Sequence, residues 1–478
     1  MKRLGKIILI LLLSLLGVVI FAVVGVTAYF YIVGSVDATV PIVDDRDLRL
    51  PFDPIPDEEN AFIVFASASD HYAVASDNYT ETCSSDYFFV TGYSERFSEN
   101  TSSRKAREEP QAESRADAIL AKHTPLFALL AEGVQRKAYR TIPAMDTLSN
   151  FASAEIIAQF MSYGALLGLK AQRELERGEL ESATQTIELL HAFSEKMLVH
   201  TDAHITSTVG DILKRKAYQK MIDVVGMGLL TDEMRNRFQA CLDADTQTAQ
   251  ANYERTVRAE YTVISAKLAQ LYLDKAYTSY AECLNPLQRL LFRWPGYLRF
   301  AFQPRASRAM FADVARQALQ GKVQKVPDEE PSLLTPNYIS KQVMLDLIGA
   351  AGGMLSDAKK DAFNRAKVRI LLAASKWKQH NNDAFPPSLD ALVPTFLSAV
   401  PVDPWSADAR PLAYHPETGT VWSVGEEGDF DYLACLNAPI SKRFGDSRYK
   451  FIWNAFRLDG KPHPLLSNNH RIPRSVEE

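Results

Sequence analysis

Residues 7–33 read IILILLLSLLGVVIFAVVGVTAYFYIV, and no charged side chain interrupts them. Leu, Ile, Val and Phe greatly outnumber the small and polar residues of this run. With a rise of about 1.5 Å per residue the run makes a helix of about 40 Å, whereas the hydrocarbon layer of a bilayer is about 30 Å thick. Ten apolar residues near its centre contribute roughly −3 to −6 kcal/mol to insertion. The stretch therefore predicts a transmembrane helix whose partner is the lipid bilayer.

The charges on the two sides of this run differ in sign. The basic residues before it are Lys2, Arg3 and Lys6, and the acidic residues after it are Asp37, Asp44, Asp45 and Asp47. Flanking Lys and Arg stay on the cytoplasmic side of a membrane. We therefore expect residues 1–6 to form a cytoplasmic tail of a single-pass inner-membrane protein. The chain from about Gly34 onward is expected in the periplasm or another extracytoplasmic space.

A cleaved signal peptide is the alternative interpretation of the same stretch. Val26, Thr27 and Ala28 include the small residues that a signal peptidase accepts. However, the apolar region of a cleavable signal is roughly 7–15 residues long, which is much shorter than this run. A retained anchor is the favoured prediction, and both interpretations place the rest of the chain outside the cytoplasm.

Length and composition limit the remaining choices. The 478 residues exceed what one hydrophobic core usually organises, so two or more units are expected beyond the anchor. Lys and Arg total 53 against 58 Asp and Glu, a net charge of −5 that gives no general attraction for nucleic acid. An apolar share of 47% is typical of a folded chain. We therefore expect a folded body that does not bind nucleic acid.

The four cysteines are widely spaced, and none stands in a C-x-x-C motif; they are Cys83, Cys241, Cys283 and Cys435. An exported protein can form disulfides, and four cysteines allow three pairings. Cys241 with Cys283 is the pairing we expect, since both flank one helical segment. Free buried thiols acting as small apolar residues remain the alternative.

The sequence beyond the anchor divides into three predicted parts. Residues 34–60 carry several prolines and acids and are expected to form an extended stalk. Residues 61–337 show apolar residues at helical spacing and predict a helical bundle. Residues 338–478 are expected to contain helices at about 338–352 and 356–381, followed by a small α+β module. The predicted fold class is therefore mainly α.

One part of the helical body has a sharper pattern. Ala171 and Leu175, then Gly178, then Ala183 and Ile187 have the spacing of a helical hairpin in which glycine opens the turn. The pattern is similar to a single tetratricopeptide-type unit. No second copy occurs at that period, so an ordinary pair of packed helices is the alternative.

Residues 286–308 alternate basic and aromatic side chains. Arg293, Trp294 and Arg299 lie in this segment, and such residues suit lipid headgroups or an acidic partner. Three prolines interrupt the segment, so a long amphipathic helix is not expected. The alternative is a crossover that packs its aromatic residues on the core while its arginines reach water.

The C-terminal part carries several local signals. Ser388 can cap a short helix at 389–393, which Pro394 ends. Residues 412–414 and 421–424 flank a turn-rich connector, which predicts a β-hairpin.

Residues 360–432 resemble the globular head of the major pseudopilins of type II secretion systems. The residues that carry the resemblance are Phe385-Pro386-Pro387-Ser388-Leu389, Leu392-Val393-Pro394, Val400-Pro401-Val402-Asp403-Pro404-Trp405, Tyr414 and Trp422-Ser423-Val424-Gly425. In that family the loop after the hairpin often binds calcium. The resemblance thus implies a calcium loop, at Glu426, Glu427, Asp429 and Asp431 here, with a solvated acidic loop as the alternative. No other cofactor is expected.

The chain also departs from the pseudopilin pattern. Gly5 is followed by Lys6-Ile7-Ile8-Leu9-Ile10, which has neither the aromatic or Met residue of a pseudopilin processing site nor its fifth-position Glu. Assembly into a fibre is therefore not expected. The whole order of anchor, helical body and pseudopilin-like tail resembles a group of signal-anchored bacterial envelope proteins, a likeness that implies no activity.

No catalytic site stands out in the sequence. His191, His200 and His204 share one helical region, but Thr201 stands where a metalloprotease would need Glu, so zinc is not favoured. G-x-S-x-G, P-loop and G-x-G-x-x-G motifs are absent from the sequence in a strand-turn-helix setting. The acid pairs at 174/176 and 243/245 are interpreted as solvated helix faces.

Three function hypotheses follow. The first is a non-enzymatic envelope protein with a structural or interaction role, linked to secretion or envelope assembly through another envelope protein. The second is an exported hydrolase whose site lies between the helical body and the C-terminal module. The third is a helical module that binds a lipid or peptide in its groove.

Overall fold

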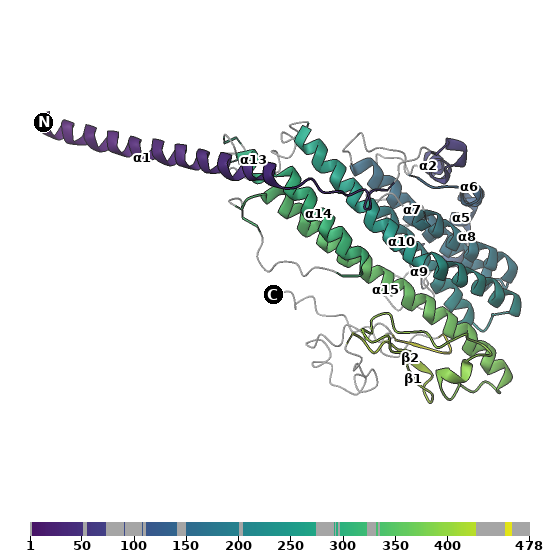
Figure 1. Ribbon diagram of the computed structural model, residues 1–478. Coiled ribbons are helices and arrows are strands. Elements are labelled where there is room, and N and C mark those ends of the chain that lie inside the picture. The colour runs from purple at the N-terminus through teal and green to yellow at the C-terminus, as the bar shows by residue number, and fades with distance from the viewer. Residues whose placement is uncertain are drawn as a thin grey trace. The chain divides into compact units, whose positions relative to one another are not determined.

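The computed structural model describes residues 2–50, 55–72, 90, 108, 111–140, 150–199, 204–273, 291, 293–294, 297–322, 331–332, 335–426 and 455–460. These residues form mainly α-helices and one small sheet, as the sequence predicts (Figure 1). The helices are α1 (Lys2–Ser35), α2 (Ala61–Tyr72), α5 (Ala112–Lys122), α6 (Thr124–Gln135), α7 (Asn150–Glu176), α8 (Leu180–Val199), α9 (His204–Gly226), α10 (Asp232–Leu273), α13 (Tyr297–Ala301), α14 (Pro304–Leu319) and α15 (Tyr338–His380).

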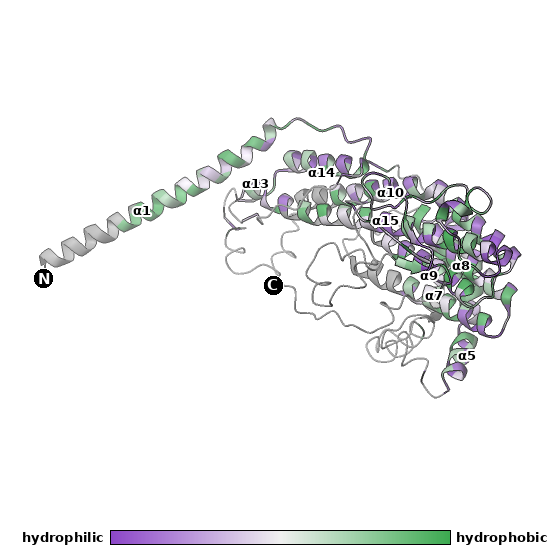
Figure 2. Cartoon of the chain, turned by 90° about the horizontal axis from the view of Figure 1, so that it is seen from below, coloured by the Kyte–Doolittle hydropathy of each residue, from purple (hydrophilic) through white to green (hydrophobic). Residues whose placement is uncertain are grey.

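Helix α1 is long and apolar enough to span a membrane, with the described span at Val18–Thr39. Most of its described large apolar side chains are exposed, among them Phe21 at 80% and Ile32 at 67%, whereas Phe30 is buried. Figure 2 shows mostly green and white residues along the coloured part of α1. A helix that exposes so much apolar surface is destabilised in water and stabilised in lipid.

The described residues form two compact units, each built from two stretches of chain. Unit 1 contains residues 1–52 and 254–355, and unit 2 contains residues 53–253 and 356–478. The long helices α10 and α15 therefore contribute to both units. This division differs from the predicted ranges 61–337 and 338–478.

In unit 1 the segment after α1 packs against helices instead of standing free as a stalk. It begins with a short 3-10 helix, η1 (Val36–Thr39). Leu48 is fully buried, and the buried Asp45 carboxylate accepts two hydrogen bonds from the Arg308 guanidinium, at 2.7 and 2.6 Å. Tyr261 of α10 donates a third at 2.6 Å, and Arg316 of α14 forms a second bidentate pair with Asp47. Bidentate Arg–carboxylate pairs fix orientation as well as charge.

In unit 2 the predicted helical hairpin is present as α7 and α8. Gly178 has a φ of +75°, a left-handed conformation that lets α7 end and α8 begin two residues later. Ala171, Leu175, Ala183 and Ile187 are all buried in one cluster between the two helices and their neighbours. The sequence pattern thus identifies the hairpin correctly.

A second core of unit 2 is aromatic. Phe65 of α2 meets Phe193 of α8 edge-on, with ring centroids 4.8 Å apart. The start of α2 is held by Asn60, whose Oδ1 accepts from the backbone N–H groups of Phe62 and Arg140. Asn60 is therefore both the N-cap of α2 and a link to residues 138–140.

Helix α15 is continuous from Tyr338 to His380, so the prediction of two helices interrupted near residues 353–355 is wrong. A glycine costs about 1 kcal/mol in a helix, which packing of the flanking residues can offset. Val368, Ile370 and Leu371 of its second half are fully buried.

The C-terminal part of unit 2 holds the small sheet. Ser388 caps the 3-10 helix η5 (Leu389–Leu392), as predicted. Strands β1 (Ala413–His415) and β2 (Thr420–Trp422) form the predicted hairpin, and β3 (Ala455–Arg457) adds an antiparallel strand beside β2.

Candidate functional site

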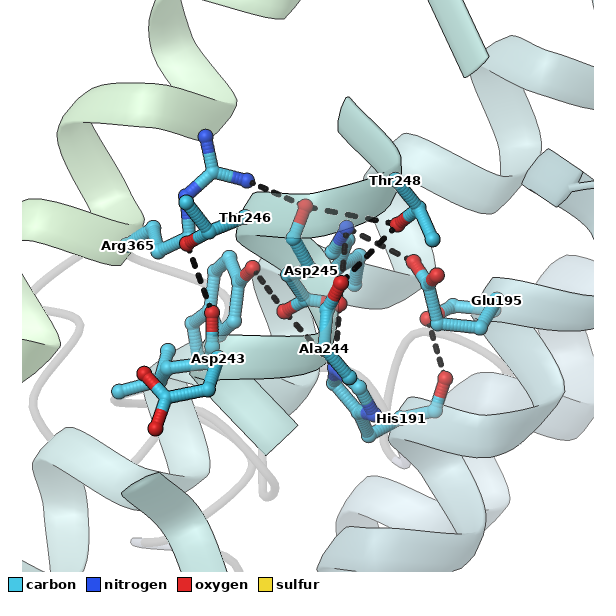
Figure 3. A network of polar contacts seen from close by, with 12 residues as sticks. His191, Glu195, Asp243, Ala244, Asp245, Thr246, Thr248 and Arg365 are labelled. Atoms are coloured by element: carbon cyan, nitrogen blue, oxygen red, sulfur yellow. Dashed lines mark hydrogen bonds and ion pairs between the residues drawn. The ribbon is translucent and has the colours of Figure 1, made fainter. Parts of the chain in front are cut away.

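Four helices of unit 2 bring charged and polar side chains to one buried cluster (Figure 3). Each helix contributes two of them, four residues apart, and residues four apart lie on the same helix face. The members, here called the charge cluster, are His191 and Glu195 of α8, Lys214 and Tyr218 of α9, Cys241 and Asp245 of α10, and Asp361 and Arg365 of α15.

Asp245 lies at the centre of the cluster, and its side chain is fully buried. Nε2 of His191 is 3.0 and 2.9 Å from its two carboxylate oxygens. The Tyr218 hydroxyl donates to Oδ2, and the Lys214 ammonium is 3.2 Å from Oδ1. A buried carboxylate is costly unless it is paired and hydrogen-bonded, and Asp245 meets both conditions.

The remaining charges pair around this centre. Nζ of Lys214 lies 2.7 Å from Oε1 of Glu195 and 3.8 Å from Oδ1 of Asp361. Arg365 donates to Oδ2 of Asp361 at 3.0 Å and to the backbone carbonyl of Asp245 at 3.2 Å. With His191 protonated, these members comprise three cations and three carboxylates, so their formal charges cancel.

The pKa values show which forms the cluster favours. Burial alone would lower the pKa of His191, but the hydrogen bonds to Asp245 and Cys241 outweigh it and raise the pKa to about 10. Burial would raise the pKa of Asp245, but His191 and Lys214 hold it below its usual range. Burial likewise opposes the charge on Lys214, yet Asp361, Glu195 and Asp245 raise its pKa. The cluster therefore stabilises imidazolium, ammonium and carboxylate together.

Metal binding is the first chemistry to test here. One donor atom each from His191, Glu195 and Asp245 lie within 4.8 Å of one another, a spacing that could hold a metal ion. However, the Lys214 ammonium is already in contact with Glu195 and Asp245. This ammonium supplies the positive charge that a metal would bring, and it would repel a metal ion. The residues present do not fit a metal centre.

General base catalysis fits no better. A general base must be unprotonated at the working pH so that it can accept a proton, whereas the raised pKa of His191 keeps its imidazole protonated well above neutrality. Its Nε2 faces both oxygens of Asp245 and does not face a substrate position. The geometry is that of a buried salt-bridge network that connects α8, α9, α10 and α15.

Cys241 of this cluster is a free thiol, so the predicted disulfide with Cys283 is wrong. Helix α10 runs to Leu273, which is about 48 Å along the axis from Cys241 at about 1.5 Å per residue. Cys283 itself lies outside the described residues.

The predicted acid pairs are not simply solvated faces, and this interpretation is wrong for one member of each. Asp245 and Glu174 are buried, while Asp243 is 56% exposed and Glu176 is 25% exposed. Residues two apart point to opposite sides of a helix, because each residue turns the helix by about 100°. One acid of each pair therefore points inward.

Of the other predicted site residues, some lie outside the described part of the chain and some belong to unit 1. The calcium loop residues Glu427, Asp429 and Asp431 lie outside the described residues, as do His200 and Cys283. Glu426 is described, and its backbone carbonyl accepts a hydrogen bond from the Ala407 N–H. Arg293, Trp294 and Arg299 belong to unit 1, whereas the charge cluster belongs to unit 2.

Sequence reasoning noticed His191 but missed its partners Lys214, Tyr218, Asp361 and Arg365. A usable signal existed, because each pair is spaced i, i+4 on a helix that is otherwise largely apolar on its buried face. The order in which four helices meet is not visible in that spacing.

No family model, curated protein or solved structure matches this chain. The pseudopilin likeness of residues 360–432 and the likeness to signal-anchored envelope proteins therefore remain predictions.

Proposed function

We propose that this chain is a single-pass, membrane-anchored envelope protein whose body acts by contact with another envelope component and not by catalysis. The observation that carries the proposal is the exposure of apolar side chains along α1, from Leu15 to Ile32. Insertion of such residues into lipid is favourable by several tenths of a kcal/mol each, up to about 0.6 kcal/mol for Leu, Ile, Phe and Val.

The orientation in this proposal places residues 1–6 in the cytoplasm and both units outside. Lys2, Arg3 and Lys6 support it, because basic residues beside a span remain on the cytoplasmic side. A link to secretion or envelope assembly rests on the pseudopilin likeness of residues 360–432.

A contact role is favoured by the charge cluster. Its carboxylates face cations, and its one histidine is held in the protonated form. Groups arranged in this way stabilise a helix bundle and leave no base ready for a substrate.

The exported hydrolase is the second candidate, and one observation favours it. His191, Glu195 and Asp245 converge with the free thiol Cys241, as nucleophile, base and orienting acid would. This reading requires His191 to titrate near neutral pH in the folded protein. An imidazole signal of His191 that changes protonation near pH 7 would favour the hydrolase over the contact role.

Membrane extraction tests the anchor. In the proposed protein, alkaline carbonate leaves the full chain in the membrane pellet. The double variant Phe21→Lys, Val24→Lys should shift protein to the supernatant, since each central lysine costs about 2.5–3.5 kcal/mol. The matched control, Phe21→Leu with Val24→Leu, should remain in the pellet. Release of the wild-type chain by carbonate would contradict the proposal.

Protease protection tests the orientation. Protease added to intact spheroplasts should degrade the body and leave a short fragment that contains α1. A body that resists protease until the spheroplasts are lysed would place it in the cytoplasm and overturn this part.

A photoreactive residue at exposed positions of the body tests the contact role. Crosslinking in intact cells should give a discrete product with one envelope protein, and that product should persist in a folded His191→Gln variant. A substrate turned over by the wild type but not by this variant would instead establish the hydrolase.

A further inference from the structure

The last turns of α1 are covered by an aromatic segment from far along the chain. Phe30 meets Tyr297 edge-on with ring centroids 5.2 Å apart, and it lies 4.9 Å from the Phe300 ring. The indole N–H of Trp294 donates to the Thr27 hydroxyl at 2.8 Å. Phe30, Tyr297 and Phe300 are almost completely buried in this small cluster. The contact is therefore a packed interface within unit 1 (Figure 1).

Close approach of the two segments depends on Gly34. A Cβ atom at this position would lie 2.7 Å from the backbone carbonyl carbon of Arg299, which is closer than real Cβ contacts allow. A hydrogen bond extends the interface by one residue: the Gln303 side chain donates to the Val33 carbonyl at 3.2 Å. Residues 27–34 of α1 thus face protein on one side.

The length of the apolar run gives the depth of this interface. If the hydrocarbon layer begins at Ile7, about 20 residues are needed to cross it, which brings the helix to about Val26. The run continues to Val33, and the excess begins at Thr27, the residue that Trp294 contacts. With the layer placed in this way, the covering segment lies at the level of the headgroups on the outer side. Trp and Tyr are enriched at this level because their rings are apolar and their N–H or O–H groups are polar.

The arginines near this segment fall into two groups. Arg305 donates to the Ala38 carbonyl, Arg308 pairs with Asp45 and Arg316 pairs with Asp47. All three arginines therefore bind the segment that follows α1.

The other group is Arg293 and Arg299, which are exposed and have no acidic partner among the residues that the structure describes. The Arg299 guanidinium lies over the Tyr31 ring, 5.8 Å from its centroid. Two arginines that pair with no acid in the described part of the chain therefore flank the aromatic contact.

We propose that Arg293, Trp294 and Arg299 form a binding surface for the phosphate headgroups of anionic phospholipid in the outer leaflet, while the buried Tyr297 and Phe300 hold this surface against α1. The proposal rests on the membrane anchoring proposed above. The aromatic residues place the surface at the interface, and the two arginines select negatively charged headgroups. Each arginine close to an anionic surface should favour such lipids locally by about fivefold.

Depth is tested with the full chain in lipid nanodiscs. The other four tryptophans are changed to Phe so that Trp294 alone fluoresces. Lipids brominated high on the acyl chain should quench it strongly, and lipids brominated near the bilayer centre should quench it weakly. A second single-Trp variant, Leu16→Trp with Trp294→Phe, should show the reverse order, because residue 16 lies midway between Ile7 and Val26.

These two variants separate the inference from the anchoring. Quenching of the tryptophan at position 16 without quenching of Trp294 would overturn the inference and leave the anchor intact. If neither tryptophan is quenched, the anchoring itself fails.

Headgroup selection is tested by bromine on one lipid class at a time. Brominated phosphatidylglycerol should quench Trp294 severalfold more than brominated phosphatidylcholine at the same mole fraction. The double variant Arg293→Gln, Arg299→Gln should abolish this preference while its far-ultraviolet circular dichroism remains that of the wild type. The control is Arg46→Gln, since Arg46 is also exposed but already paired with Asp44. Equal quenching by both lipids in the wild type would show that the surface does not select headgroups.

Discussion

His191 and Asp245 are separated by 54 residues of sequence, yet Nε2 of the imidazole lies within 3.0 Å of both carboxylate oxygens. The pair joins α8 to α10, and Lys214 and Tyr218 of α9 complete it. Removing one member of such a buried pair leaves the other charge without compensation.

The Asp245→Asn variant should therefore be strongly destabilised. Breaking a buried ion pair typically costs about 3–5 kcal/mol, because the imidazolium and ammonium lose their counter-charge. Urea unfolding followed by circular dichroism measures this loss. Asp243→Asn is the matched control on the same helix: Asp243 is 56% exposed and pairs with Arg369, so about 0–1 kcal/mol is expected. Equal losses in both variants would contradict a central role for Asp245.

Stability should depend on the protonation of His191. Its pKa is 6.5 as a free side chain and about 10 in the folded protein. The stabilisation is therefore fully present below pH 6.5 and is lost progressively as the pH rises toward about 10. Urea unfolding at a series of pH values should show this decline, and His191→Gln should remove it. Nuclear magnetic resonance of the ring nitrogens should find an imidazolium at pH 7 in the wild type, and a neutral ring there would contradict the assignment.

Asp211 of α9 should act in the opposite direction. Burial and the nearby charge of Asp361 raise its pKa from 3.8 to about 7, although Lys214 partly offsets them. The unfolded chain then ionises this group more easily, so its contribution becomes unfavourable as the pH rises from about 4 to 7. Asp211→Asn should stabilise the protein above pH 7 by at most about 4 kcal/mol, since one pKa unit corresponds to about 1.4 kcal/mol. The gain should vanish below pH 3.8, and a gain independent of pH would refute the explanation.

Asp403 should contribute strongly to the stability of the small C-terminal sheet. Its buried carboxylate accepts from the Ser423 hydroxyl at 2.8 Å, from the Val424 N–H at 2.7 Å and from the Trp405 N–H at 3.0 Å. Asp403→Ala leaves these donors without an acceptor, at a cost of about 1–3 kcal/mol for each one that stays buried. Hydrogen exchange of the β2 amides should accelerate strongly. Asp408→Ala removes an acid that is 71% exposed and should change exchange little.

Local features of the fold were readable from the sequence, because neighbouring residues determine them. The apolar run of α1, the Gly178 turn, the Ser388 cap and the β1–β2 hairpin each depend on a few consecutive positions. Continuity of α15 was missed because tertiary packing outweighs the local preference of its glycines.

The charge cluster was not readable in the same way. His191 looked like one of three ordinary helix histidines, and Asp245 looked like half of an acidic surface pair. Their meaning depends on how α8, α9, α10 and α15 rotate about their axes and meet, which no single helix encodes. Spacing identifies which side chains share a face, but only the packed structure identifies the facing partner.

The docking of the segment after α1 has a mechanical consequence. A flexible tether of the same 15 residues, 36–50, would let the chain that follows it move about 20 Å from the end of α1. Asp37 instead accepts the Ala306 N–H at the start of α14, and Asp45 and Asp47 hold the arginines farther along that helix. In the membrane-anchored protein proposed above, the helices of unit 1 would therefore stay close to the bilayer and move laterally with α1. A partner of unit 1 would then have to reach the plane of the membrane.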